Sequence, residues 1–135
     1  MISFNYETEF QLSKEEERRR WVSDTIKNED RLEGEINYIF CDDEYLLSLN
    51  QQYLDHDTLT DIISFDYSVG NKLHGDIYIS IQRVLENASD FGVNKDDEID
   101  RVMIHGVLHY CGYKDKTKED QLLMRSKEDF YLSRR

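Results

Sequence analysis

The sequence contains no proline, and it shows no internal repeat, low-complexity tract or linker. Its 135 residues match the length of one ordinary domain, since about 100–200 residues per domain is usual. Hydrophobic residues make up 39% of the chain, which is enough for one core without stabilising disulfide bonds. We therefore expect a single domain over residues 1–135.

Cysteines and long hydrophobic runs are also scarce. The two cysteines, Cys41 and Cys111, have no C-x-x-C neighbour, and the N-terminus has neither the basic start nor the apolar run of a signal peptide. A disulfide framework is therefore not expected. No stretch approaches the roughly 20 apolar residues that a membrane-spanning helix needs. These absences predict a soluble, cytoplasmic protein without a membrane partner.

Positive charge is in short supply as well. The chain has 29 aspartates and glutamates against 17 lysines and arginines, which gives a net charge of −12 at pH 7. Nucleic-acid-binding proteins usually carry a basic surface that contacts phosphates. An RNA-binding function would therefore require a local source of positive charge in this acidic protein.

Hydrophobic periodicity and turn residues predict four strands and five helices. The strands are expected over 2–10, 35–41, 60–67 and 75–81, and the helices over about 14–28, after Asp42 or Asp43, and over about 81–91, 95–111 and 118–132. The apolar run at 60–67 is typical of a central strand, and it forms a hairpin with 75–81. The order βαβαββααα predicts an α+β fold, with a mixed sheet of about four strands and helices packed on it.

Local signals also mark where several helices begin. Ser13 with Glu16 has the pattern of a capping box before the first helix, and Thr117 with Asp120 resembles another cap before the last one. Asn94 is expected to cap the helix that starts near residue 95. These three caps predict where the first helix and the last two helices begin.

The segment HGVLHYCGYKD, residues 105–115, has the spacing of a metal site on a C-terminal helix. His105 and His109 lie about 40° apart around a helix axis, so two imidazoles on one face can bind one zinc ion. Gly112 allows the chain to leave the helix, and Asp115 then takes the third ligand place of the zincin motif H-E-x-x-H-x-x-G-x-x-H. A histidine pair alone is often only a helix face, but the glycine and the third donor favour a metal.

Two further residues of this segment limit its chemistry. Three protein ligands leave a fourth position for water, which is the pattern of a catalytic site. Gly106 stands where metalloproteases have their glutamate, so peptide hydrolysis by that mechanism lacks its base. Cys111 lies about 200° around the helix from His109, and we expect it to be a small buried side chain rather than a ligand.

These segments resemble a known family. HGVLHYCGYKD resembles the H-G-x-L-H-L-x-G-Y-D-H signature of the YbeY-type endoribonucleases, which take part in the maturation of ribosomal RNA. LNQQYLDHDTLTDIISFDY, at 49–67, is similar to the family's L-N-x-x-Y-R-x-K-D-x-P-T-D-V-L-S-F, and GDIYIS, at 75–80, is similar to its G-D-I strand. The resemblance implies a zinc-dependent, single-strand-specific endoribonuclease that acts on ribosomal RNA and the ribosome, with no DNA partner.

The sequence departs from the family in two places. Two of the family's three histidine ligands carry over to His105 and His109, and the third falls on Asp115, which keeps a donor but adds a negative charge. The resemblance thus implies one zinc ion held by these three residues, which would act in catalysis through the metal. The family's phosphate-contacting arginine falls on Leu54, which cannot hold a phosphate, and its lysine falls on His56.

Other residues are candidates for supporting roles. His56, Lys114 and Lys116 are the candidates to replace the lost positive charge, and His56 is also a candidate catalytic residue. The alternative for the lysines is a solvated turn, and for His56 a surface loop. Asp61 and Asp76 could each support the metal ligands or only cap a turn.

The preferred interpretation is a metal-dependent endoribonuclease in ribosomal RNA processing, in which the metal offsets the acidity of the protein. The alternative is a non-enzymatic ribosome-associated factor whose metal has only a structural role, which the net charge and Leu54 favour. A metallopeptidase is disfavoured by Gly106.

Overall fold

The computed structural model describes residues 1–53 and 60–135, and its elements follow the predicted order. None of the helices in these residues has the length and apolar character needed to cross a membrane. The strands are β1 (Ile2–Tyr6), β2 (Leu32–Cys41), β3 (Ile62–Asp66) and β4 (Lys72–Ser80). The helices are α1 (Glu15–Asn28), α2 (Asp43–Tyr53), α3 (Ile81–Phe91), α4 (Lys95–Tyr110) and α5 (Lys118–Leu132).

The four strands form one mixed sheet in the order β1-β2-β4-β3. β1, β2 and β4 are parallel, and β3 pairs antiparallel with β4 through the predicted hairpin. The prediction of a central strand at 60–67 was wrong, because β3 lies at the edge of the sheet. Its apolar run has another cause: Ile62 packs on the main core and Ile63 packs on the opposite face, so both faces of this edge strand are covered.

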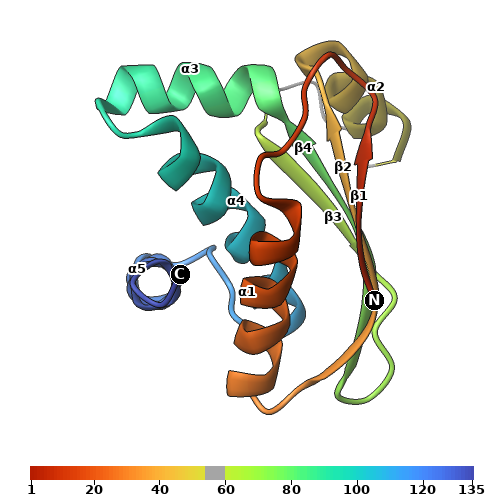
Figure 1. Cartoon of the computed structure of the whole chain (residues 1–135), viewed down its shortest axis with the longest axis vertical. Coiled ribbons are helices and arrows are strands. Elements are labelled where there is room, and N and C mark those ends of the chain that lie inside the picture. The colour runs from red at the N-terminus through yellow and green to blue at the C-terminus, as the bar shows by residue number, and fades with distance from the viewer. Residues whose placement is uncertain (54–59) are drawn as a thin grey trace.

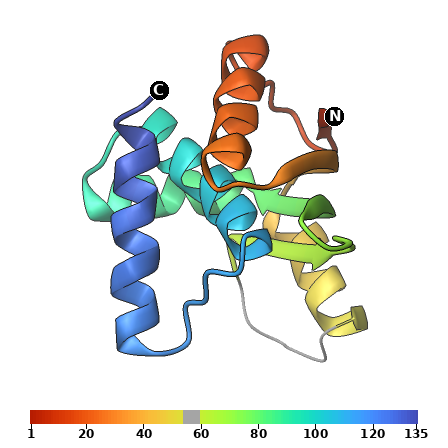
Figure 2. The ribbon, with the colours of Figure 1, turned by 90° about the horizontal axis from the view of Figure 1, so that it is seen from below.

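The two faces of the sheet are covered unequally. Alternate strand side chains point to opposite faces, and on β4 Ile77 and Ile79 join the main core whereas Tyr78 joins a small cluster with Leu46 of α2. Figure 1 shows α1, α3 and α4 on one side of the sheet and α2 on the other. Figure 2 shows α5 on the outer side of α4, away from the sheet. The face that carries α4 therefore holds most of the buried hydrophobic residues.

Three of the predicted strand boundaries were wrong by three or four residues, namely the end of β1 and the starts of β2 and β4, and the reasons are tertiary. β1 ends at Tyr6 rather than at residue 10, because its partner β2 ends one residue after the Tyr6–Phe40 pair. The apolar alternation continues to Phe10, whose ring packs on those of Tyr6 and Phe40 instead of extending the strand. β2 starts three residues earlier than predicted, at Leu32, because it pairs there with the early start of β4.

The first helix does not use the predicted capping box. Lys14 occupies the N-cap position in the left-handed conformation, with no side-chain hydrogen bond to the helix. Ser13 instead accepts hydrogen bonds from Arg18, and Glu16 pairs with Arg19. The caps at Asn94 and Thr117 are confirmed, since each side chain accepts backbone N–H bonds of its helix. Asp42 likewise accepts from a backbone N–H at the start of α2.

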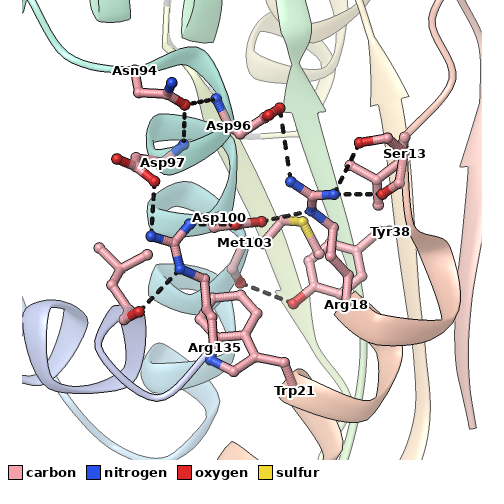
Figure 3. A network of polar contacts seen from close by, with 12 residues as sticks. Ser13, Arg18, Trp21, Tyr38, Asn94, Asp96, Asp97, Asp100, Met103 and Arg135 are labelled. Atoms are coloured by element: carbon pink, nitrogen blue, oxygen red, sulfur yellow. Dashed lines mark hydrogen bonds and ion pairs between the residues drawn. The ribbon is translucent and has the colours of Figure 1, made fainter.

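A buried ion-pair network ties α1 and the C-terminal residue to α4 (Figure 3). The carboxylate of Asp100 is 4% exposed and accepts from Arg18 Nε at 2.7 Å and from Arg135 Nη1 at 2.7 Å. Arg135 also pairs with Asp97 at 2.7 Å. Nearby, the Tyr38 hydroxyl donates to the Met103 carbonyl at 2.9 Å, so α4 is anchored to the sheet as well. These contacts hold α4, the helix with both histidines, in a fixed position.

Candidate metal centre

Three donor atoms converge at the C-terminal end of α4. His105 Nε2 and His109 Nε2 are 3.0 Å apart, and Asp115 Oδ2 is 3.3 Å from each of them. With metal–ligand bonds of about 2.0–2.1 Å, the edges of a tetrahedral zinc site measure about 3.3–3.4 Å. Within the part of the chain that the structure describes, this is the one group of three metal-type donors that lies so close together. The spacing fits a single small divalent ion.

Hydrogen bonds on the far side of each imidazole aim both histidines at the same point. His105 Nδ1 lies 2.7 Å from Glu128 Oε2, and His109 Nδ1 lies 2.9 Å from the Tyr113 carbonyl. Because these acceptors hold the Nδ1 protons, the Nε2 lone pairs face each other and the Asp115 carboxylate. Such a convergence of lone pairs is repulsive unless a cation lies between them, so the donor set fits a metal ion.

The electrostatics around His105 favour positive charge at this point. Burial opposes its charged form, but the hydrogen bond and charge of Glu128, then Asp115 and Asp61, outweigh burial and raise the pKa of His105. The same carboxylates that stabilise an imidazolium would stabilise a bound cation. Glu128 is 6% exposed at its side chain and is itself paired with Arg101 at 2.9 Å, so its position is fixed.

The loop after α4 brings Asp115 to the histidines. Gly112 has a φ of 99°, a left-handed conformation that favours glycine, and it turns the chain out of the helix as predicted. The Tyr113 hydroxyl then donates to Glu29 Oε1 at 2.7 Å, and Gln121 Nε2 donates to the Asp115 carbonyl at 3.1 Å. These two bonds fasten the loop on either side of the ligand.

Glu29 is expected to make stability depend on pH. Burial alone would raise its pKa, but hydrogen bonds from Tyr131 and Tyr113 and the charge of Lys127 outweigh burial and lower the pKa below 4.5. A carboxyl group with a lowered folded-state pKa stabilises the protein above its unfolded pKa, and this contribution disappears as pH falls through the folded value. Urea unfolding of wild type and Glu29→Gln, both with chelator, should show a stability difference at pH 7 that shrinks below about pH 4.5. A difference that is constant with pH would contradict this assignment.

The three donors open into a hollow of about 540 Å³ between α4, α5 and β3. Besides the three donors it is lined by Asp61, Ser64, Glu98, Glu128, Arg101, Arg125 and five other residues. A larger hollow of about 780 Å³ lies on the α2 face; half of its ten lining residues are aromatic, and none is a histidine. We assign the chemistry to the smaller hollow, because it holds the converging donors.

Gly106 has a packing role that explains why no glutamate stands there. A Cβ atom on Gly106 would lie 3.0 Å from Ile77 Cδ1 and 3.2 Å from Ile62 Cδ1. Position 106 therefore faces the sheet at close approach, and not the hollow. Asp61 instead lines the hollow, and burial is the main cause that raises the pKa of its carboxyl group. Asp61 could support the metal ligands or only cap a turn, and its place in the lining of the hollow favours the first role.

The remaining predicted candidates lie elsewhere. Lys114 and Lys116 are exposed and do not line the hollow, in agreement with a solvated turn. A further histidine, His74, was not among these candidates; its Nδ1 accepts the backbone N–H of Glu35, so it serves the contact between β2 and β4. The side chain of Asp76 accepts from Asn37 at 3.0 Å, also within the sheet.

Leu54 and His56 lie outside the described residues. Cys111 is buried as expected, and burial raises the pKa of its thiol to about 11.

Several residues of the site were not predicted from the sequence. Glu128 and Arg125 are placed by the packing of α5 against α4, whereas Glu98 and Arg101 lie two turns and one turn before His105 on α4 itself. Glu128 is 23 residues from the histidine that it orients, and its helix shows no local motif. Glu128 is one of several acidic residues on α5, and its burial becomes recognisable only once the partner of that helix is known.

Comparison with known proteins agrees with the fold and the motifs. A model of the family described as Endoribonuclease YbeY matches residues 2–135. A relative named endoribonuclease YbeY from Flavobacterium psychrophilum is 68% identical over 129 residues, covering 96% of this chain and 92% of the relative. One of the same name from Flavobacterium johnsoniae is 62% identical over 129 residues, covering 96% and 93%. A solution structure of a Thermotoga maritima protein matches with a TM-score of 0.70 at 27% identity, over 98% of this chain and 87% of that one. This chain, whose motifs resemble those of the YbeY-type endoribonucleases, belongs to the endoribonuclease YbeY family.

Proposed function

We propose that this protein is a zinc-dependent endoribonuclease that cleaves single-stranded RNA in the cytoplasm, during ribosomal RNA processing and ribosome maturation. His105, His109 and Asp115 hold one zinc ion. The observation that carries the proposal is the convergence of their three donor atoms, 3.0–3.3 Å apart, at the wall of an open hollow. The names of the relatives, which call them endoribonucleases, support the reaction class.

The protein's own residues have distinct roles in this proposal. Glu128 and the Tyr113 carbonyl orient the two imidazoles by hydrogen bonds of 2.7 and 2.9 Å. Asp61 lines the hollow with a carboxyl group whose pKa burial raises, and we assign it as the group that accepts the proton from the attacking water. When bound, zinc lowers the pKa of water and offsets negative charge on the phosphate.

The metal also answers the problem of net charge. The hollow is lined by four carboxylates, and in an acidic protein a phosphate would be repelled from such a surface. A divalent ion at the point where the donors converge supplies the largest positive charge of the site. Phosphate binding would therefore depend on the metal more strongly than in a basic nuclease.

The test is cleavage of a single-stranded RNA by protein purified without added metal. Cleavage should stop with chelator and return with zinc, while casein stays intact under every condition, because position 106 provides no base for peptide hydrolysis. A protein that binds RNA and keeps its fold but cleaves nothing with zinc would instead be a non-enzymatic ribosome-associated factor with a structural metal. Casein hydrolysis abolished by His105→Ala would overturn the reaction class.

A further inference from the structure

The hollow beside the metal-binding group is lined by two arginines, and one of them is already fully paired. Arg101 donates from Nη1 to Glu128 at 2.9 Å and from Nη2 to Asp129 at 2.6 Å, and its side chain is 18% exposed. These bonds occupy both ends of its guanidinium, so Arg101 serves to fix Glu128. It is poorly placed to bind a ligand.

Arg125, one helical turn before Glu128 on α5, is in the opposite situation. Its side chain is 63% exposed, and its Nη1 lies 3.8 Å from Glu128 Oε1, which is too long for a hydrogen bond. It lines the hollow with the histidines and also the two smaller hollows that adjoin it. An arginine so placed can offer several N–H donors to a phosphate without breaking an existing bond.

Helix α3 contributes an aromatic ring and an amide to the same hollow. Phe91 is the last residue of α3 and is 70% exposed. It lines the main hollow and also one of the adjoining hollows, and Arg125 lines both of these as well. Asn87, one turn earlier, lines the main hollow and is half-buried. Its side-chain amide makes no hydrogen bond to the residues that the structure describes, so the amide is available to a ligand.

We propose that Phe91, Asn87 and Arg125 form a subsite for one nucleotide of single-stranded RNA next to the metal-binding group. The base stacks on the ring of Phe91, the amide of Asn87 bonds to the base edge, and a neighbouring phosphate pairs with Arg125. This inference rests on the proposed function, because it places the RNA that the metal site would cleave. Bases within a duplex are stacked on one another, so the subsite selects unpaired strands.

The experiment measures binding of a short, unstructured, fluorescently labelled RNA by anisotropy, with zinc present and the RNA shown by gel electrophoresis to stay intact during the measurement, at several salt concentrations. Phe91→Ala should weaken binding about 5- to 150-fold, the range for loss of one stacked base, without changing the salt dependence. Arg125→Gln should reduce the slope of log affinity against log salt by about 0.7, the value for one phosphate contact on a single strand. The salt slope separates a phosphate contact from a structural effect, which would leave it unchanged.

Two matched variants control for exposed aromatic and basic residues elsewhere. Tyr67→Ala removes a ring that is 60% exposed in the hollow on the α2 face. Arg20→Gln removes an exposed arginine of α1. Both should bind RNA like the wild type, and thermal unfolding should show that all four variants fold. The subsite is wrong if Phe91→Ala and Arg125→Gln bind normally, or if Tyr67→Ala causes the larger loss.

The outcomes also separate this subsite from the proposed function. If wild type cleaves RNA with zinc while both subsite variants bind and respond to salt like wild type, only the subsite is refuted. If wild type neither binds nor cleaves single-stranded RNA, both proposals fall. The same RNA annealed into a duplex should bind more weakly, and Phe91→Ala should not weaken it further. If Phe91→Ala weakens duplex binding as much as it weakens single-strand binding, the ring does not stack on an unpaired base.

Discussion

Replacing His105 or His109 with alanine is expected to release the metal ion from the purified protein and to abolish RNA cleavage. Each variant removes one of three donors, and the remaining two cannot complete the site. Removing a residue that only hydrogen-bonds to a metal ligand lowers metal affinity about 10- to 100-fold, and the loss of metal affinity in these two variants should be larger. Elemental analysis measures the metal content of each variant, and competition with a chelating dye measures its metal affinity.

The matched control is His74→Ala, because this histidine lies in β4 and accepts a backbone N–H from Glu35 at 3.0 Å. It should retain the metal and the activity. If His105→Ala and His109→Ala both keep full metal, the ion is bound elsewhere and the centre described here is wrong.

Asp115 allows the third position to be tested in the same assay. Asp115→His should keep tight zinc binding, because imidazole is a natural zinc donor, whereas Asp115→Ala should bind much more weakly. If Asp115 were only an exposed turn residue, both variants would bind zinc like the wild type. Equal affinities in the three proteins would therefore remove Asp115 from the site.

Asp100→Ala is expected to cause the largest loss of stability, about 3–5 kcal/mol, because it leaves a buried charge without its partner. The Asp100 side chain is 4% exposed and that of Arg18 is 10% exposed, so water cannot replace the lost carboxylate. Arg135 loses a partner as well. Urea unfolding followed by circular dichroism, with chelator in every sample, measures the change.

Asp96→Ala provides the comparison for this prediction. Asp96 contacts the same arginine, but at 3.8 Å and with its side chain 66% exposed. Its loss should cost less than about 1 kcal/mol, as is usual for exposed ion pairs. Similar losses in the two variants would mean that Asp100 does not act through burial of the pair.

The features predicted correctly from the sequence depend on residues close together in the chain. The i, i+4 spacing places His105 and His109 on one face of a helix, whatever that helix packs against. Asn94 and Thr117 cap their helices through bonds to N–H groups two or three residues away. Gly112 turns the chain by its own conformational freedom. Such geometry follows from the backbone alone.

The mistaken predictions concern residues whose partners are distant. Ser13 and Glu16 have the pattern of a capping box, but the buried Arg18 takes Ser13 as an acceptor and Arg19 takes Glu16. The run at 60–67 has the composition of a central strand, whereas its neighbours place it at the sheet edge. In both cases the local preference is real, and a tertiary contact outweighs it.

The sequence by itself determined the order of the elements, the histidine pair with Asp115, and the absence of a metalloprotease base at Gly106. Only the tertiary structure decided which residues surround that centre. Glu128 and Arg125 reach it because α5 packs against α4, and Phe91 reaches it because α3 ends at the rim of the same hollow. Helix packing depends on complementary surfaces across the whole core, and no spacing within one segment records which face of a helix will meet which neighbour.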